Sequence, residues 1–100
     1  MENIFVYGNL RNLEIQKKVI GRIAESSEDS IRGYKLSQIN LRGEIFPILI
    51  TSGSSRDFVV GLVLEVSEEE LKKIDKFETD AYKRKRVVLS SGKDSWVYVK

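Results

Sequence analysis

The sequence predicts an α+β fold with about five or six short β-strands and one clear helix. Short apolar or alternating segments recur along the chain and end at turn residues, which is typical of strands. One segment, beginning at Ser67, has a helical pattern with a capping signal. A chain of 100 residues, 41% of them hydrophobic, has room for one modest core, so we expect a single domain over residues 1–100.

The first predicted strand covers residues 3–7. After Asn3 it is an unbroken run of β-branched and aromatic residues that stops at Gly8, so we expect it to be buried. Residues 12–19 have the pattern of one or two helical turns capped by Asn12, although so short a segment is marginal as a helix.

The middle of the chain is predicted to hold two strands. Residues 25–30 are polar and flexible in composition, whereas residues 30–39 alternate between polar and apolar side chains with one slip at Gly33. This slip indicates a bulge within a strand. Residues 46–50 predict another buried strand, and Pro47 near its start indicates a sheet edge or the rim of a pocket, because proline has no N–H to donate to a ladder.

A long strand and then a helix are predicted next. Residues 57–66 form the strand, with Gly61 at a possible kink or at a close approach of another segment. Ser67 and Glu70 have the spacing of a capping box, in which each side chain accepts from the backbone N–H of the other residue. We therefore expect a helix over residues 68–78.

The chain ends in a predicted hairpin. Residues 82–89 and 94–99 have strand patterns, and Gly92 lies in the turn between them. No internal repeat, linker or low-complexity tract interrupts the sequence.

The composition excludes several classes of chemistry. The chain has no cysteine and no histidine, so disulfides, thiolate zinc sites and imidazole bases are excluded, and acid–base chemistry would fall to Glu, Asp, Lys or Tyr. The net charge of +2 is far from the strongly basic balance of a nucleic-acid binder. No apolar stretch is long enough to span a bilayer and no signal-peptide pattern opens the sequence, so we expect a cytoplasmic protein that binds neither nucleic acid nor membrane.

The predicted helix carries a carboxylate on its apolar face. At 100° per residue, Glu78 projects between Leu71 and Ile74, the residues that define the core-facing stripe. Desolvation and the negative end of the helix dipole would raise the pKa of such a carboxyl, which suits a proton shuttle. In the alternative interpretation the helix frays before its end, and Glu78 forms a surface ion pair with Arg84 or Arg86.

The turn after the first strand is a second candidate for function. Glycine tolerates backbone angles that other residues avoid, so the N–H groups of Gly8, Asn9 and Leu10 could point to one place and form a cradle for an anion or an oxyanion. The alternative is an ordinary glycine turn at the end of a strand.

Several segments, taken in order, resemble one known family. They are residues 6–11 (VYGNLR), 46–49 (FPIL), 60–66 (VGLVLEV), 74–78 (IDKFE), 82–84 (YKR) and 97–99 (VYV). Their order and spacing resemble the gamma-glutamylcyclotransferase-like family, which includes gamma-glutamylamine cyclotransferase-like proteins. The resemblance covers nearly the whole chain.

This resemblance implies a small mixed β-barrel of five or six strands with one main helix, in which the glycine loop and the helix-end glutamate face one cavity. Enzymes of the family convert gamma-glutamyl amines or amino acids into 5-oxoproline and a free amine, without a metal or an organic cofactor. By resemblance Glu78 is the acid–base residue and Tyr82 lies near it. The loop that holds the glutamyl moiety through backbone N–H groups is formed by Tyr7, Gly8, Asn9 and Leu10.

Two positions depart from the family pattern. Asn9 stands where threonine or serine is more usual, and Thr79 follows the glutamate where glycine is common. We therefore keep as an alternative a non-catalytic domain of the same fold that binds a small ligand or serves in an assembly. The basic residues 83–86 would alternate between two faces of a strand, which is a small footprint for nucleic acid. Neither the leaving amine nor the oligomeric state follows from the sequence.

Overall fold

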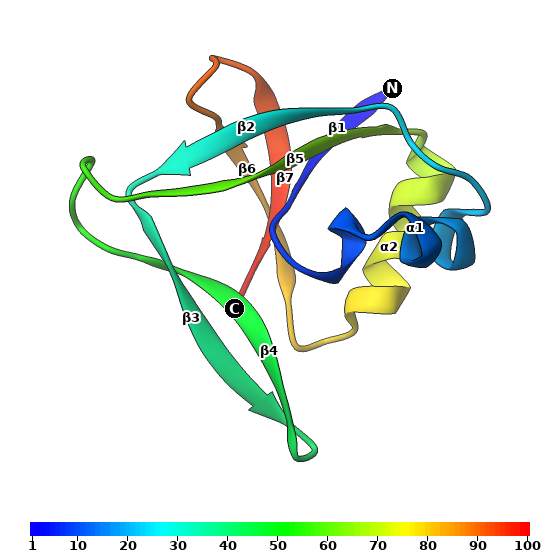
Figure 1. Ribbon diagram of the computed structural model, residues 1–100, viewed down its shortest axis with the longest axis horizontal. Helices are drawn as coiled ribbons and strands as arrows, with labels where there is room; N and C mark the ends of the chain where they lie inside the picture. The colour runs from blue at the N-terminus through cyan, green and yellow to red at the C-terminus, as the bar shows by residue number, and fades with distance from the viewer.

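A computed structural model describes residues 1–100 and confirms the α+β class (Figure 1). Seven strands and two α-helices follow one another along the chain. Their bounds are β1 (Glu2–Val6), a 3-10 turn η1 (Asn9–Arg11), α1 (Leu13–Ile20), β2 (Ser26–Arg32), β3 (Tyr34–Leu41), β4 (Glu44–Thr51), β5 (Phe58–Val66), α2 (Glu68–Glu78), β6 (Lys83–Val88) and β7 (Asp94–Val99). Neither helix has the length and apolar character that crossing a bilayer requires.

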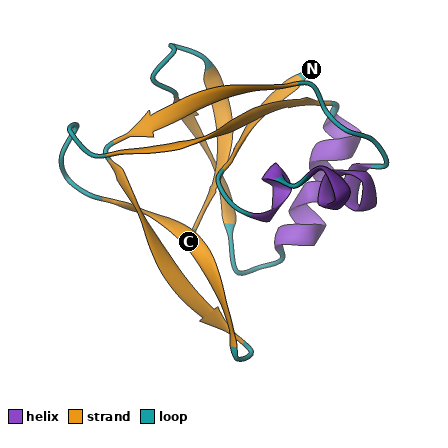
Figure 2. Cartoon of the chain, in the orientation of Figure 1, coloured by secondary structure: helices purple, strands orange, loops and turns teal.

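The strands form two separate sheets. Five of them make one sheet in the order β2-β5-β1-β7-β6, in which β1 and β7 are parallel and the other neighbours are antiparallel. The hairpin of β3 and β4 is a second, two-stranded sheet that projects from the body of the molecule (Figure 2). Helices α1 and α2 pack against each other at one end of the larger sheet.

The fold fits the predicted small mixed barrel, except that seven strands are present and the sheets do not close into a strict barrel. The edge strands β2 and β6 do not pair with each other, but hydrogen bonds link β2 to the β6–β7 turn, where the Ser90 N–H donates to the Ser30 carbonyl at 2.8 Å. Asp29 reinforces this contact by accepting hydrogen bonds from the backbone N–H and the hydroxyl of Ser91. The barrel is not closed by further strands, because the chain leaves the sheet after β2 and forms the separate hairpin of β3 and β4.

Gly33 explains why residues 30–39 are not one strand. Its φ of +81° turns the chain out of the large sheet, so β2 ends before it and β3 begins after it. The segment 25–30, predicted to be flexible, instead lies largely within β2, which pairs with β5 from Ser26 to Arg32. Its exposed polar side chains suit an edge strand, and the backbone pairing to β5 orders it.

Both helices begin as predicted. The Asn12 side chain accepts hydrogen bonds from the N–H groups of Glu14 and Ile15 at the start of α1. The capping box of α2 is complete, since the Ser67 hydroxyl accepts from the Glu70 N–H and the Glu70 carboxylate accepts from the Ser67 N–H. Helix α2 spans Glu68–Glu78, the range expected from the sequence.

Strand β1 is buried on both faces, which accounts for its unbroken apolar run. Ile4 and Val6 pack toward the helices, whereas Phe5 and Tyr7 belong to a second core cluster on the opposite face. The predicted close approach at Gly61 is confirmed, because a Cβ there would lie 2.4 Å from the Val6 carbonyl oxygen and 2.7 Å from the Phe5 ring. The core therefore fixes the end of β1 from both sides.

Candidate active site

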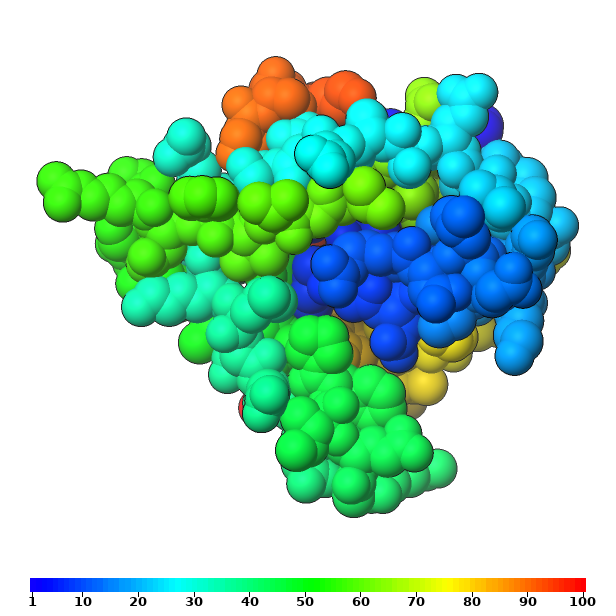
Figure 3. Space-filling model, viewed as in Figure 1, coloured from blue at the N-terminus to red at the C-terminus, as the bar shows by residue number.

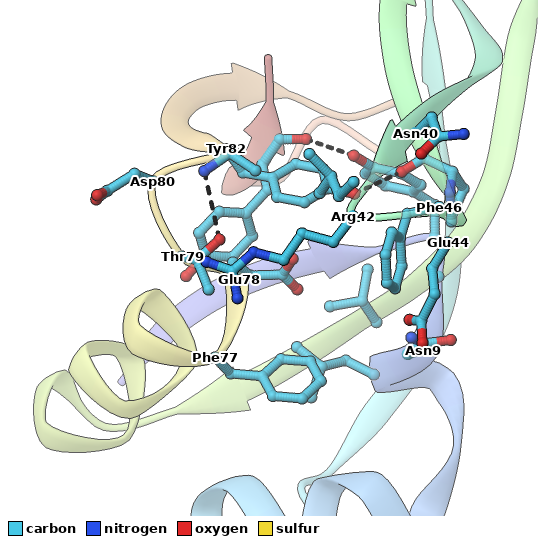
Figure 4. A pocket seen from close by; sticks show the side chains of 18 of the residues that line it. Asn9, Asn40, Arg42, Glu44, Phe46, Phe77, Glu78, Thr79, Asp80 and Tyr82 are labelled. Atoms are coloured by element: carbon cyan, nitrogen blue, oxygen red, sulfur yellow. Dashed lines mark hydrogen bonds between the residues drawn. The ribbon is translucent and has the colours of Figure 1, made fainter.

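A cavity of about 970 Å³ opens where the β1–η1 connection, the β3–β4 hairpin and the end of α2 meet. In the space-filling view the hairpin, in green, lies next to the N-terminal segment, in blue, and to the end of α2, in yellow (Figure 3). The six residues that the sequence analysis selected for a site all line this cavity (Figure 4). They are Tyr7, Gly8, Asn9, Leu10, Glu78 and Tyr82.

Two observations bear on the glycine at the start of the loop. Gly8 has φ −127° and ψ −134°, so its φ is not positive, but the pair lies outside the helical and extended regions that other residues favour. Space also favours a glycine here, since a Cβ would lie 3.1 Å from the Pro47 ring. The N–H groups of Gly8, Asn9 and Leu10 take part in none of the loop or side-chain hydrogen bonds of the chain, as is typical of residues that open a helical turn.

Gln16 braces this loop, and the sequence analysis missed it. Its buried side chain donates to the Leu10 carbonyl at 2.9 Å and accepts from the Ala24 N–H at 3.1 Å. A buried amide with both ends bonded holds two backbone segments at once. One sequence signal was available, because Gln16 lies four residues before Ile20 and therefore on the buried face of α1.

Glu78 is the last residue of α2 and lines the cavity while only partly exposed. The alternative pairing predicted for it does not form, because Arg84 pairs with Asp75 at 2.7 Å and Arg86 lies 3.6 Å from Glu2. The Glu78 carboxylate has neither an ion pair nor a side-chain hydrogen bond within the chain. Burial raises the pKa of this carboxyl to about 7. Glu78 can therefore gain and lose a proton near neutral pH.

Three tyrosines surround the carboxylate. The Tyr7 hydroxyl donates to the Tyr98 carbonyl at 2.7 Å, the Tyr82 hydroxyl donates to the Pro47 carbonyl at 2.9 Å, and the Tyr98 hydroxyl donates to Asp75 at 2.6 Å. Burial raises the pKa of all three phenols, and the nearby Glu78 charge adds to the rise. They stay protonated at neutral pH, and their hydroxyls join the hairpin, β7 and α2 around the cavity.

Backbone strain is concentrated at the mouth of the cavity. Arg42 and Thr79 are the non-glycine residues of the chain with positive φ, +53° and +62° respectively, and both line this cavity. Thr79 combines its φ with a ψ of −172°, a region that is essentially reserved for glycine. No group of three or more acidic side chains is arranged to hold a metal ion.

Comparison with known proteins agrees with the fold. A family model described as gamma-glutamyl cyclotransferase, AIG2-like, matches residues 4–100. The chain belongs to this family. The resemblance drawn from the ordered motifs of the sequence is thereby confirmed.

Several AIG2-like proteins from Arabidopsis thaliana are similar to this family member. AIG2-like protein C is 30% identical over 86 residues, which is 85% of this chain and 48% of that protein. AIG2-like protein B is 32% identical over 85 residues, covering 84% of this chain and 47% of that protein. The chain thus spans about half the length of the curated relatives it matches.

Solved structures show the same fold. A solution structure of an Arabidopsis thaliana protein superposes with a TM-score of 0.78 at 27% identity, covering 98% of this chain and 61% of that one. A structure described as gamma-glutamyl cyclotransferase has a TM-score of 0.74 at 16% identity, covering 98% of this chain and 65% of that one. At that identity the second likeness concerns the fold alone.

Proposed function

We propose that this member of the gamma-glutamyl cyclotransferase, AIG2-like family is an enzyme that converts gamma-glutamyl amines or amino acids into 5-oxoproline and a free amine. The observation that carries the proposal is Glu78, an unpaired carboxylate whose pKa burial raises to about 7, facing the same cavity as the Gly8 loop. A glutamate poised near neutral pH suits acid–base chemistry.

The proposed reaction is an intramolecular ring closure. The α-amine nitrogen of the substrate attacks the γ-carbonyl carbon, a new C–N bond closes the five-membered ring, and the original γ C–N bond breaks. The Glu78 carboxylate takes a proton from the attacking nitrogen and returns it to the leaving nitrogen, so it ends in its initial state. Because nucleophile and carbonyl belong to one molecule, the protein mainly holds the folded conformer.

We assign the glutamyl end of the substrate to the Gly8 loop. The N–H groups of Gly8, Asn9 and Leu10, which take part in none of the loop or side-chain hydrogen bonds, are available to the substrate carboxylate or to the oxyanion of the transition state. Tyr7 and Tyr82 would contact the substrate through their rings, because their hydroxyls already donate to main-chain carbonyls. The partner is thus a small gamma-glutamyl compound.

A panel of gamma-glutamyl donors with 5-oxoproline as the readout tests the proposal. Glu78→Gln keeps the size of the side chain but cannot shuttle a proton, so turnover should fall about 10²- to 10⁴-fold. Glu69→Gln is the matched control, because Glu69 is exposed on the same helix outside the cavity. Full turnover in Glu78→Gln would contradict the role of Glu78, and no 5-oxoproline from any donor would contradict the activity.

The non-catalytic alternative uses the same cavity. It predicts that gamma-glutamyl ligands bind without releasing 5-oxoproline, so the donor panel combined with calorimetry separates the two. Nucleic-acid binding is disfavoured because Arg84 and Arg86 stack on Trp96, with centroid distances of 4.5 and 5.0 Å, and lie beside acidic groups of the chain. Cytoplasmic location, cofactor independence and a single domain stay predictions.

A further inference from the structure

We propose that Arg42 binds a carboxylate on the leaving group, so that gamma-glutamyl amino acids are better ligands than gamma-glutamyl amines without that carboxylate. This inference rests on the proposed function and names its substrate class. It concerns the mouth of the cavity, which the sequence analysis did not connect with function.

Arg42 is the basic residue of the cavity lining. Its side chain extends from the β3–β4 turn across the mouth toward Thr79 and the end of α2 (Figure 4). None of the five ion pairs of the chain includes it. The guanidinium therefore has its donors available for a ligand, and its planar fork matches the geometry of a carboxylate.

The backbone at Arg42 supports a role beyond the turn itself. Arg42 and Gly43 are the two residues of the hairpin loop, since the last cross-strand pair is Leu41 with Glu44. Their φ values of +53° and +84° are those of a turn in which Asn-Gly or Asp-Gly is favoured at these two positions. An arginine held in this conformation is strained, and such residues are concentrated at functional sites.

None of the three acidic residues that line the cavity pairs with Arg42. Asp80 points away from the cavity, Glu44 lies beside Asn9, and Glu78, which is drawn next to the Arg42 guanidinium, forms no ion pair with it (Figure 4). If the loop holds the glutamyl end and Glu78 serves the γ-amide, the leaving group extends toward the mouth. An α-amino acid carries its carboxylate one carbon from the leaving nitrogen, which places that carboxylate near the reach of Arg42.

Gamma-glutamylalanine and gamma-glutamylethylamide make a matched ligand pair, because they differ only by the carboxylate of the leaving group. Binding is measured by calorimetry in the Glu78→Gln background, where turnover does not interfere. Adding Arg42→Asn should weaken the alanine compound about tenfold, as expected for a charge-assisted pair, and the ethylamide less than twofold. Asn-Gly suits the turn, so the hairpin is retained, which the melting temperature checks.

Two further variants sharpen the comparison. Arg42→Lys keeps the charge without the fork and should give an intermediate loss for the alanine compound. Arg56→Asn removes the same charge from an exposed side chain outside the cavity and should change neither affinity. Equal weakening of both ligands by Arg42→Asn, no weakening of either, or no binding of gamma-glutamylalanine before Arg42 is changed would overturn the proposal.

The turnover arm separates this inference from the proposed function. In the protein with Glu78 intact, Arg42→Asn should raise the KM for gamma-glutamylalanine and leave kcat and its pH profile unchanged. A shift of the pH profile for both donors would mean that Arg42 acts on Glu78, which overturns the proposal. Selective loss of binding without 5-oxoproline from either donor would support the assignment of Arg42 and contradict the proposed enzyme.

Discussion

At the scale of single residues, two neighbouring positions at the end of α2 each hold a residue in an unfavourable state. Glu78 is an ionisable group whose charged form is disfavoured by burial, and Thr79 is a β-branched residue in a glycine conformation. Each is unfavourable for stability, and both lie on the cavity. Such concentration of unfavourable features is typical of functional sites, where stability is reduced in return for chemistry.

The raised pKa of Glu78 makes stability depend on pH. The folded protein holds this proton up to pH about 7 whereas the unfolded chain releases it near 4.5, so the contribution of Glu78 to stability is fully present below 4.5 and is lost as pH rises through 7. Glu78→Gln removes this dependence. The melting temperature of the variant minus that of the unmodified protein should therefore increase from pH 5 to pH 8. A constant difference across this range would contradict the buried carboxyl.

Thr79→Gly should stabilise the protein. A non-glycine residue in this region of φ and ψ costs about 1–3 kcal/mol, and glycine returns about 0.5–1 kcal/mol of that through the entropy of the unfolded chain, so we expect a gain of about 1 kcal/mol. Urea unfolding measures it. Thr79→Ala is the control, since it also loses the hydroxyl that accepts from the Ala81 N–H but keeps the Cβ. Equal gains from both variants would show that the backbone strain is not the cause.

At the scale of elements, the pairing of β1 with β5 sets where the glycine loop begins. Because Gly61 has no side chain, β5 can lie directly against Phe5 and Val6, and Val6 is two residues before Gly8. The position of Gly8 in the cavity therefore depends on a residue that is far from it in sequence and does not line the cavity.

Gly61→Ala should destabilise the protein and move the loop. The added methyl group would overlap the Val6 carbonyl and the Phe5 ring, and overpacking of this kind costs about 1–3 kcal/mol. Chemical denaturation gives the loss of stability, and amide chemical shifts at Gly8 report the displacement. Val60→Ala is the control on the same strand, because Val60 is 57% exposed and should change stability by less than about 0.5 kcal/mol.

At the scale of the whole molecule, a group of hydrogen bonds between β2 and the β6–β7 turn joins the two edges of the five-stranded sheet. Asp29 lies in β2 and accepts hydrogen bonds from Ser91 in the β6–β7 turn, beside the backbone bond between Ser30 and Ser90. Partial burial raises the pKa of Asp29, but the hydrogen bonds from Ser91 and Ser30 outweigh it and the net shift is downward. The charged form is thus the one that holds the edges together.

Asp29→Ala should lower the free energy of unfolding by about 1–2 kcal/mol, because it removes the two hydrogen bonds that Ser91 donates to Asp29. Since the folded pKa is lowered, this contribution is present above the ordinary pKa of 3.8 and is lost as pH falls through the lower folded value. The two proteins should therefore converge in stability toward pH 2. Asp94→Ala, an exposed residue of the same hairpin, should have little effect, and an equal loss there would contradict the proposed role of the contact.

Much of this architecture is determined by local sequence. The strand at β1, the capping box and bounds of α2, the close approach at Gly61 and the inward direction of Glu78 all follow from periodicity and from residue types a few positions apart. These patterns act within one element, so a linear reading detects them.

Other features were decided by tertiary structure. The composition of residues 25–30 resembles a loop, and only pairing with β5 makes it a strand. Glu78 has no ion pair with Arg84 because Arg84 pairs with Asp75, which lies 9 residues before it in the sequence (84 − 75). The contact of Gln16 with the loop and the position of Arg42 at the cavity both depend on segments that come together only in the folded protein. Contacts between distant residues depend on how whole elements pack, and no local pattern encodes that packing.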